Sequence, residues 1–131
     1  MPLGRTYTLT SSFGHRISPT KGTADFHTGQ DFAAQEGTPV VSASGGEVAF
    51  VGWNGGYGNL VRVHHSGGVE SWYAHLSEID VQVGDRLQPG QRLGAVGSTG
   101  NSTGPHLHLE IRVNDQAVDP ELWLSSEGLQ L

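Results

Sequence analysis

The chain has 131 residues and a formal net charge of −6 at pH 7. This length suits a single domain with a buried core, which we expect to span residues 1–131. The acidic balance and the absence of any lysine or arginine run argue against binding to nucleic acid or an anionic membrane. No apolar run approaches the roughly 18 residues of a membrane span. Because cysteine is absent, any metal site must use histidine and carboxylate ligands.

Short apolar runs rich in valine and aromatic residues follow one another from Pro39 onward. They read PVVSA, GEVAFVGW, NLVRVHH, VESWYAHL, VQVGDRL and RLGAVG. Such runs predict strands, and the 20 glycines, several of them between these runs, predict turns rather than a linker. Asn54 and Gly55 form a tight-turn signal, and His65 to Gly68 form a second. We therefore expect three of these strands to form a meander.

The second half of the chain continues in the same way. The segment VGDRLQPGQRLG contains one turn signal at Gly84 and another at Pro89. A short C-terminal helix is predicted where Asp119 can cap a helix that begins at Pro120. The expected fold class is therefore all-β, mainly antiparallel, with one short helix near the C-terminus.

The segment HLHLEIRV alternates apolar and polar residues, as a strand with one buried face does. The apolar face would hold Leu107, Leu109, Ile111 and Val113. The opposite face would hold His106, His108, Glu110 and Arg112. This pattern places two imidazoles side by side, about 6.8 Å apart along the strand.

Other candidate residues lie far from this segment in the sequence. His27 and Asp31 are four residues apart, and Gly29 between them favours an extended or irregular backbone over a helix. His75 lies in SWYAHLS, where a strand would place it on the same face as Tyr73. A single histidine is most often a surface or hydrogen-bonded residue, so only the combination of these positions indicates a functional site.

A zinc site could be assembled from these residues. Catalytic zinc usually takes three nitrogen or oxygen ligands from the protein and leaves a fourth position for water. His27, Asp31 and one histidine of HLH would supply that number. The motif HExxH is absent, which excludes the helical zinc-protease pattern.

Three separated motifs resemble those of the lysostaphin-type zinc metallopeptidases, a family of peptidoglycan endopeptidases. The motifs are FHTGQDFAA, WYAHLS and VGSTGNSTGPHLHLEIRVN, in the family's order and with similar spacing. The resemblance extends from about residue 10 to residue 120. It implies a small antiparallel β-sheet or sandwich domain, of the duplicated hybrid motif kind, with a metal in a groove walled by loops.

The resemblance also implies roles for five residues. His27, Asp31 and His108 would be the ligands of one Zn²⁺ ion. His75 and His106 would be the catalytic histidines, one accepting a proton from water and the other stabilising the oxyanion or protonating the leaving amine. Either assignment of these two tasks is compatible with the sequence.

The groove walls implied by the resemblance are four segments: Gly14 to Phe26, Trp53 to Asn59, Ser77 to Asp80, and Ser98 to Pro105. The first of them, which contains ISPTKGTAD, has no tyrosine that could serve as an oxyanion donor. Tyr73 and Asn59 are the alternative candidates to line the cleft.

Three other interpretations each match part of the sequence. GNSTG matches a nucleophile-elbow pattern at Ser102, but that motif needs a following helix, whereas Pro105 and an alternating strand follow here. A biotinyl or lipoyl carrier domain has a similar strand pattern but needs a lysine at a turn of that region, and the only lysine is Lys21. A non-catalytic cell-wall binding or amidase-activating module of the same fold usually lacks some site residues, and here all five are present.

The expected function is therefore zinc-dependent endopeptidase activity on the stem or cross-bridge peptides of bacterial peptidoglycan, by a zinc-activated water assisted by two histidines. Both glycine bridges and D-amino-acid cross-links fit the sequence. Such a substrate predicts a location in the cell envelope or outside the cell. The first residues lack the features of a signal peptide, so we expect any export signal or inhibitory segment to lie outside this chain.

Overall fold

The computed structural model describes the backbone of residues 8–11, 14–17, 24–27, 29–100, 102 and 104–120. Side chains are described for residues 29–100, 102 and 104–120. The predicted C-terminal helix beyond Pro120 and the side chain of His27 lie outside the described parts.

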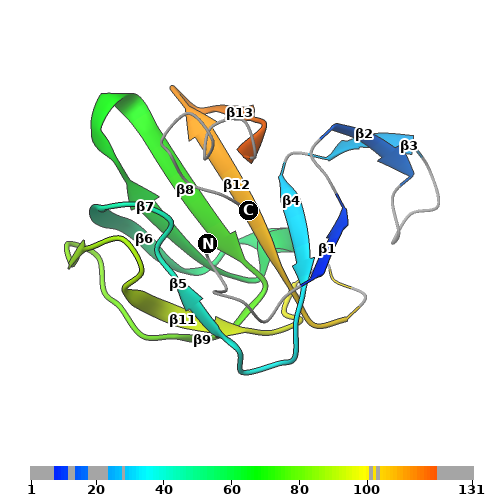
Figure 1. Cartoon of the computed structure of the whole chain (residues 1–131), viewed down its shortest axis with the longest axis horizontal. Coiled ribbons are helices and arrows are strands. Elements are labelled where there is room, and N and C mark those ends of the chain that lie inside the picture. The colour runs from blue at the N-terminus through cyan, green and yellow to red at the C-terminus, as the bar shows by residue number, and fades with distance from the viewer. Residues whose placement is uncertain are drawn as a thin grey trace.

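An antiparallel sheet of eight strands forms the main layer of the fold (Figure 1). Its order is β1 (Thr8–Ser11), β4 (Gln30–Ala33), β12 (His106–Val113), β8 (Val69–Ala74), β7 (Asn59–His64), β6 (Gly46–Trp53) and β10 (Arg86–Leu87), with β13 (Gln116–Val118) beside β12. Consecutive strands β6, β7 and β8 pair as neighbours, so the predicted meander is confirmed. Its two connections are the short turns η1 (Gly55–Tyr57) and η2 (Ser66–Gly68).

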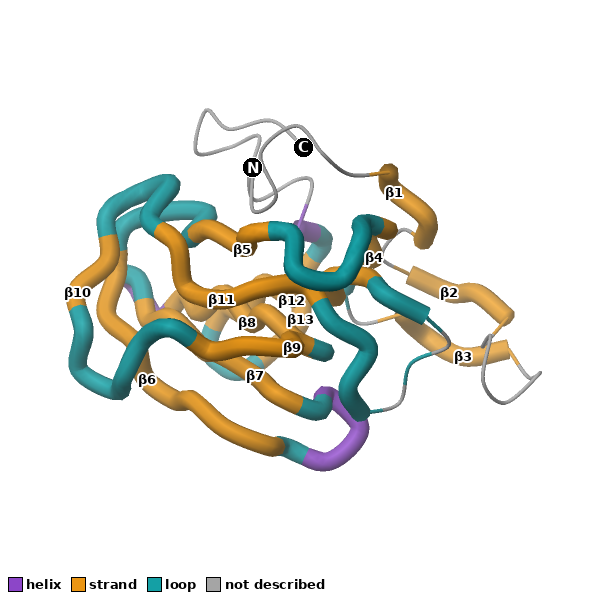
Figure 2. Tube along the Cα trace, turned by 90° about the horizontal axis from the view of Figure 1, so that it is seen from below, coloured by secondary structure: helices purple, strands orange, loops and turns teal. Residues whose placement is uncertain are grey.

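A second sheet and a hairpin complete the described strands. The second sheet has the order β5 (Pro39–Val41), β11 (Arg92–Val96) and β9 (Leu76–Ile79), and the hairpin pairs β2 (Gly14–Ile17) with β3 (Ala24–His27). Figures 1 and 2 show the three-stranded sheet lying across one face of the large sheet, with the hairpin beyond the edge formed by β1 and β4. The segment from Ser77, predicted as a loop, instead begins inside β9 and pairs with β11.

The main core lies between the two sheets. Its fully buried members include Phe32, Val40, Val61, Val63, Tyr73, Leu76, Leu93, Val96, Leu107, Leu109 and Ile111. The last three confirm the predicted alternation of the HLHLEIRV strand, because its apolar face points into this core. The prediction of a mainly antiparallel all-β fold is likewise confirmed. Within the described residues, no helix is long and apolar enough to cross a membrane.

A smaller apolar cluster covers part of the opposite face of the large sheet. Leu60, Trp72 and Ala74 form it, and Phe50 and Tyr57 pack against it. The polar face of β12 therefore adjoins an aromatic layer instead of open solvent. This placement sets the environment of the histidines on β12.

Candidate functional site

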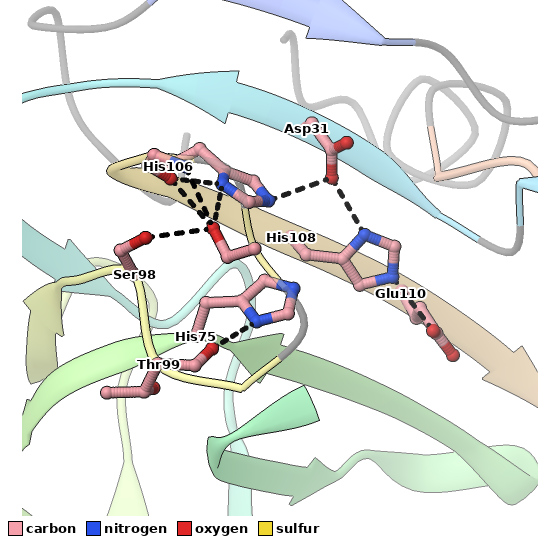
Figure 3. Close-up of polar contacts among 9 residues, drawn as sticks. Asp31, His75, Ser98, Thr99, His106, His108 and Glu110 are labelled. Carbon is pink, nitrogen blue, oxygen red and sulfur yellow. Dashed lines mark hydrogen bonds and ion pairs between the residues drawn. The ribbon is translucent and has the colours of Figure 1, made fainter. Parts of the chain in front are cut away.

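Two of the predicted metal ligands meet across neighbouring strands. His108 on β12 lies directly opposite Asp31 on β4, although the two are 77 residues apart in sequence. The Nδ1 atom of His108 is 2.8 Å from Oδ1 of Asp31 (Figure 3). On its other side, His108 is paired with Ala74 of β8, whose small side chain leaves room for the ring.

Gly29 allows β4 to approach β12 this closely. A Cβ atom at this position would lie 2.2 Å from the carbonyl oxygen of Leu109 and 2.9 Å from Cγ of Glu110. Any other residue here would force the two strands apart, because such distances are far inside van der Waals contact. The glycine between the two predicted ligands His27 and Asp31 thus has a packing role.

His106 lies one strand repeat before His108 and on the same face. Its Nδ1 donates a hydrogen bond to the carbonyl oxygen of Gly104 at 2.8 Å, since that oxygen can only accept. The other ring nitrogen, Nε2, lies 3.7 Å from Oδ1 of Asp31. The backbone contact therefore orients the ring so that Nε2 faces the predicted metal ligands.

His75 lies in the same cluster, but its backbone position differs from the one that the alternation pattern predicts. The prediction that it lies on a strand, on the face of Tyr73, is wrong, because His75 separates β8 from β9 and has a φ of +62°. This left-handed backbone interrupts the alternation of side chains, so Tyr73 points into the core while the His75 ring lies 4.8 Å from the ring of His106. The ring of His108 is 5.9 Å away.

The position of His75 is fixed by the two loops beside it. Its backbone N–H donates to the carbonyl of Tyr57, and its Nδ1 donates to the carbonyl of Thr99 at 2.6 Å. The loops also contact each other, because the hydroxyl of Thr99 accepts from the backbone N–H of Asn59 and donates to the carbonyl of Leu76. As for His106, these contacts leave Nε2 of His75 directed toward the cluster.

The environment shifts the pKa values of His75 and His108 in opposite directions. Burial lowers the pKa of His75 to about 4, although its hydrogen bond to Thr99 opposes the change. Burial also lowers the pKa of His108, but hydrogen bonds to Asp31 and Glu110 outweigh it and raise the pKa to about 9. His75 is therefore neutral near pH 7, whereas the two carboxylates beside His108 favour its protonated form.

Glu110 contacts His108 in a way that the sequence did not indicate. It was expected on the outer face of the strand, yet it is fully buried and lies 2.9 Å from Nε2 of His108. Its charge is balanced by Arg112, which donates to it from Nε and Nη2. The signal that was available is the i, i+2, i+4 spacing of His108, Glu110 and Arg112 on one face.

The third predicted ligand is described only through its backbone. His27 is the last residue of β3, and β4, which carries Asp31, begins at Gln30. Among the described side chains, no group of three or more histidine, aspartate or glutamate residues is arranged to hold a metal ion. The described part of the site thus contains two of the three predicted ligands.

The other residues considered from the sequence have structural contacts. The hydroxyl of Tyr73 accepts from the backbone N–H of Ala43 in the core, so Tyr73 does not line a cleft. The side chain of Asn59 donates to the carbonyl of Leu76. Ser102 donates to the carbonyl of Gly104 at 2.8 Å, and its oxygen is 3.2 Å from Nδ1 of His106.

Comparison with known proteins identifies relatives along most of the chain. The model of peptidase family M23 matches residues 25–120. A DD-carboxypeptidase/endopeptidase Mpg of Neisseria meningitidis is 49% identical over 112 residues, which cover 86% of this chain and 26% of that protein. The chain therefore spans about a quarter of the length of this curated relative.

Two solved structures share the fold. A zinc-containing peptidase from Vibrio cholerae has a TM-score of 0.83 at 37% identity, over 90% of this chain and 37% of that one. The catalytic domain of lysostaphin from Staphylococcus simulans has a TM-score of 0.82 at 37% identity, over 91% of this chain and 92% of that one. The resemblance read from the three sequence motifs is confirmed, together with the predicted metallopeptidase class: the chain belongs to peptidase family M23.

Proposed function

We propose that this chain is a zinc-dependent endopeptidase domain that cleaves peptide bonds of bacterial peptidoglycan. His27, Asp31 and His108 are the proposed ligands of one zinc ion, and His75 and His106 are the proposed catalytic residues. The observation that carries this proposal is the pairing of Asp31 with His108 at 2.8 Å, with two further histidine rings beside them.

The described donor atoms suit zinc. Carboxylate oxygen and imidazole nitrogen are its usual ligands, and three of them leave one position open in a catalytic site. Oδ1 of Asp31 and Nδ1 of His108 face each other, as two ligands of one ion would. The chain position of His27, three residues before β4, is compatible with a third ligand from the neighbouring hairpin.

The two remaining histidines can perform the proton transfers of peptide hydrolysis. When bound, zinc would lower the pKa of a water molecule and polarise the scissile carbonyl. His75 and His106 each hold Nδ1–H against a backbone carbonyl, so the Nε2 atom of each can accept a proton from the water or, once protonated, donate one. An imidazolium at either position would stabilise the oxyanion and protonate the leaving amine.

The choice of substrate is supported by the relatives. Lysostaphin of Staphylococcus simulans and a glycyl-glycine endopeptidase of Staphylococcus capitis are 41% and 44% identical to this chain. We extend to this chain the hydrolysis of stem or cross-bridge peptides of the wall. The cell envelope or the extracellular space is then the proposed place of action.

Digestion of purified peptidoglycan tests the proposal. Walls with glycine bridges and walls with direct D-amino-acid cross-links are incubated with the zinc-loaded protein, and the released peptides are analysed by mass spectrometry. We expect peptides cut at one type of bond, loss of cutting after chelation and recovery on adding zinc. Binding to the wall without any cut bond in both wall types would instead support the non-catalytic module.

A further inference from the structure

Both ring nitrogens of His108 face a carboxylate. Nδ1 lies 2.8 Å from Oδ1 of Asp31, and Nε2 lies 2.9 Å from Oε2 of Glu110. Glu110 reaches the ring because positions i and i+2 of a strand project from the same face. Figure 3 shows Asp31 and Glu110 at the two nitrogen atoms of the same ring.

The carboxylate of Glu110 is itself held in place. It is 0% exposed, and its second oxygen, Oε1, accepts from Nε and Nη2 of Arg112 at 2.9 and 2.8 Å. Arg112 in turn donates to the hydroxyl of Tyr57 and lies 3.9 Å above the ring of Trp72. A buried carboxylate with both oxygens paired in this way keeps its position.

We infer that Glu110 is a positioning residue for the proposed metal ligand His108. It accepts a hydrogen bond from Nε2–H, which keeps the proton on Nε2 and leaves Nδ1 as the coordinating atom. This inference rests on the proposed function, because it adds a partner to one of the proposed ligands. A metal-bound histidine commonly donates its other N–H to a carboxylate, which fixes the tautomer and the ring orientation and makes the ligating nitrogen more basic. Glu110 is fully buried, so it acts through His108 and not on the substrate.

The sheet contains a matched control for the ion pair alone. Glu70 on β8 accepts from Nε and Nη2 of Arg62, and Arg62 also lies over the Trp72 ring, at 4.6 Å. This pair repeats the Glu110 and Arg112 arrangement, but the further donor to Glu70 is Nε1 of Trp72 and not a histidine ring. Comparing the two glutamates therefore separates the effect of Glu110 on His108 from the effect of losing a glutamate–arginine ion pair.

The experiment measures the zinc affinity of Glu110→Gln and Glu70→Gln against the wild-type protein by competition with a chromophoric chelator. Glutamine keeps an acceptor oxygen but removes the charge. We expect Glu110→Gln to weaken zinc binding by about 10- to 100-fold, the range for partners of metal ligands, and Glu70→Gln to leave it unchanged. A folded Glu110→Gln protein with wild-type zinc affinity, or an equal loss in both variants, would overturn the inference.

A spectroscopic measurement adds a readout that a loss of stability does not produce. In the zinc-loaded protein, long-range proton–nitrogen NMR spectra are expected to show His108 with its proton on Nε2, in a strong hydrogen bond that weakens in Glu110→Gln. If that variant does not fold, Glu110→Asp keeps the charge near Arg112 but draws it away from Nε2, and undiminished zinc affinity then counts against the inference. A wild-type protein that binds no zinc would instead refute the proposed function.

Discussion

Asp31 and His108 are expected to differ from the other site residues in what their loss removes. Oδ1 of Asp31 and Nδ1 of His108 face each other at 2.8 Å, and replacing either residue by alanine removes one of these two proposed ligand atoms. We expect His108→Ala and Asp31→Ala to lose bound zinc and peptidoglycan hydrolysis together. Metal analysis of the purified variants and a wall digestion assay check this, and full zinc occupancy in His108→Ala would show that the ligand assignment is wrong.

His75 and His106 are expected to be needed for catalysis but not for zinc binding. Each directs Nε2 toward the cluster through a backbone hydrogen bond at Nδ1, and neither is a proposed ligand. We expect His75→Ala and His106→Ala to retain zinc while kcat falls by about 100- to 10,000-fold, the usual contribution of general acid–base catalysis. Zinc content and single-substrate kinetics on a defined peptide test this, and near-normal kcat in both variants would contradict the catalytic role.

Ser102 provides a test against the serine-hydrolase interpretation. Its hydroxyl is 3.2 Å from Nδ1 of His106, but it donates to Gly104, and β12 follows instead of a helix. We expect Ser102→Ala to hydrolyse peptidoglycan at a rate near that of the wild type. Loss of a true serine nucleophile would lower kcat by roughly six orders of magnitude. Such a loss in this variant would support serine chemistry.

At the scale of elements, the contact of β4 with β12 depends on Gly29. An added Cβ would meet the carbonyl oxygen of Leu109 at 2.2 Å, so the strands must separate and Asp31 must move relative to His108. We expect Gly29→Ala to lower the free energy of unfolding by about 1–3 kcal/mol and to weaken zinc binding. Gly45→Ala, whose Cβ has no atom closer than 3.7 Å, is the control. Urea denaturation of both variants measures the difference.

The strands also show where the sequence was sufficient to predict the direction of side chains and where it was not. Alternation in β12 identified both its core face and its paired histidines, because a strand has a fixed period of two. The same rule failed at His75, because a single left-handed residue turns the chain from the large sheet to the small one. A φ above zero in a residue other than glycine depends on surrounding contacts, here those with Tyr57 and Thr99, and local sequence does not reveal it.

For the whole molecule, the fold class followed from short apolar runs separated by glycines, but the division into two sheets did not. β8 and β9 are separated by one residue, yet they belong to different sheets. That arrangement depends on which faces pack together, and this is a tertiary property. The burial of Glu110 was missed for the same reason, since the aromatic layer beside it comes from Tyr57 and Trp72 on other parts of the sheet.

The packed core predicts how the stability of the whole domain depends on alkaline pH. Burial raises the pKa of Tyr73, which is fully buried, above the value of about 10 that it has in the unfolded chain. The stability that the protein gains from keeping the buried Tyr73 protonated is fully present below pH 10. It is lost above that pH, because the unfolded chain then binds fewer protons than the folded one. Urea denaturation from about pH 9 to about pH 11 should show stability falling by up to about 1.4 kcal/mol per pH unit from this group. In Tyr73→Phe, stability should be lower at neutral pH but fall less steeply, and an unchanged slope would show that Tyr73 is not the group responsible.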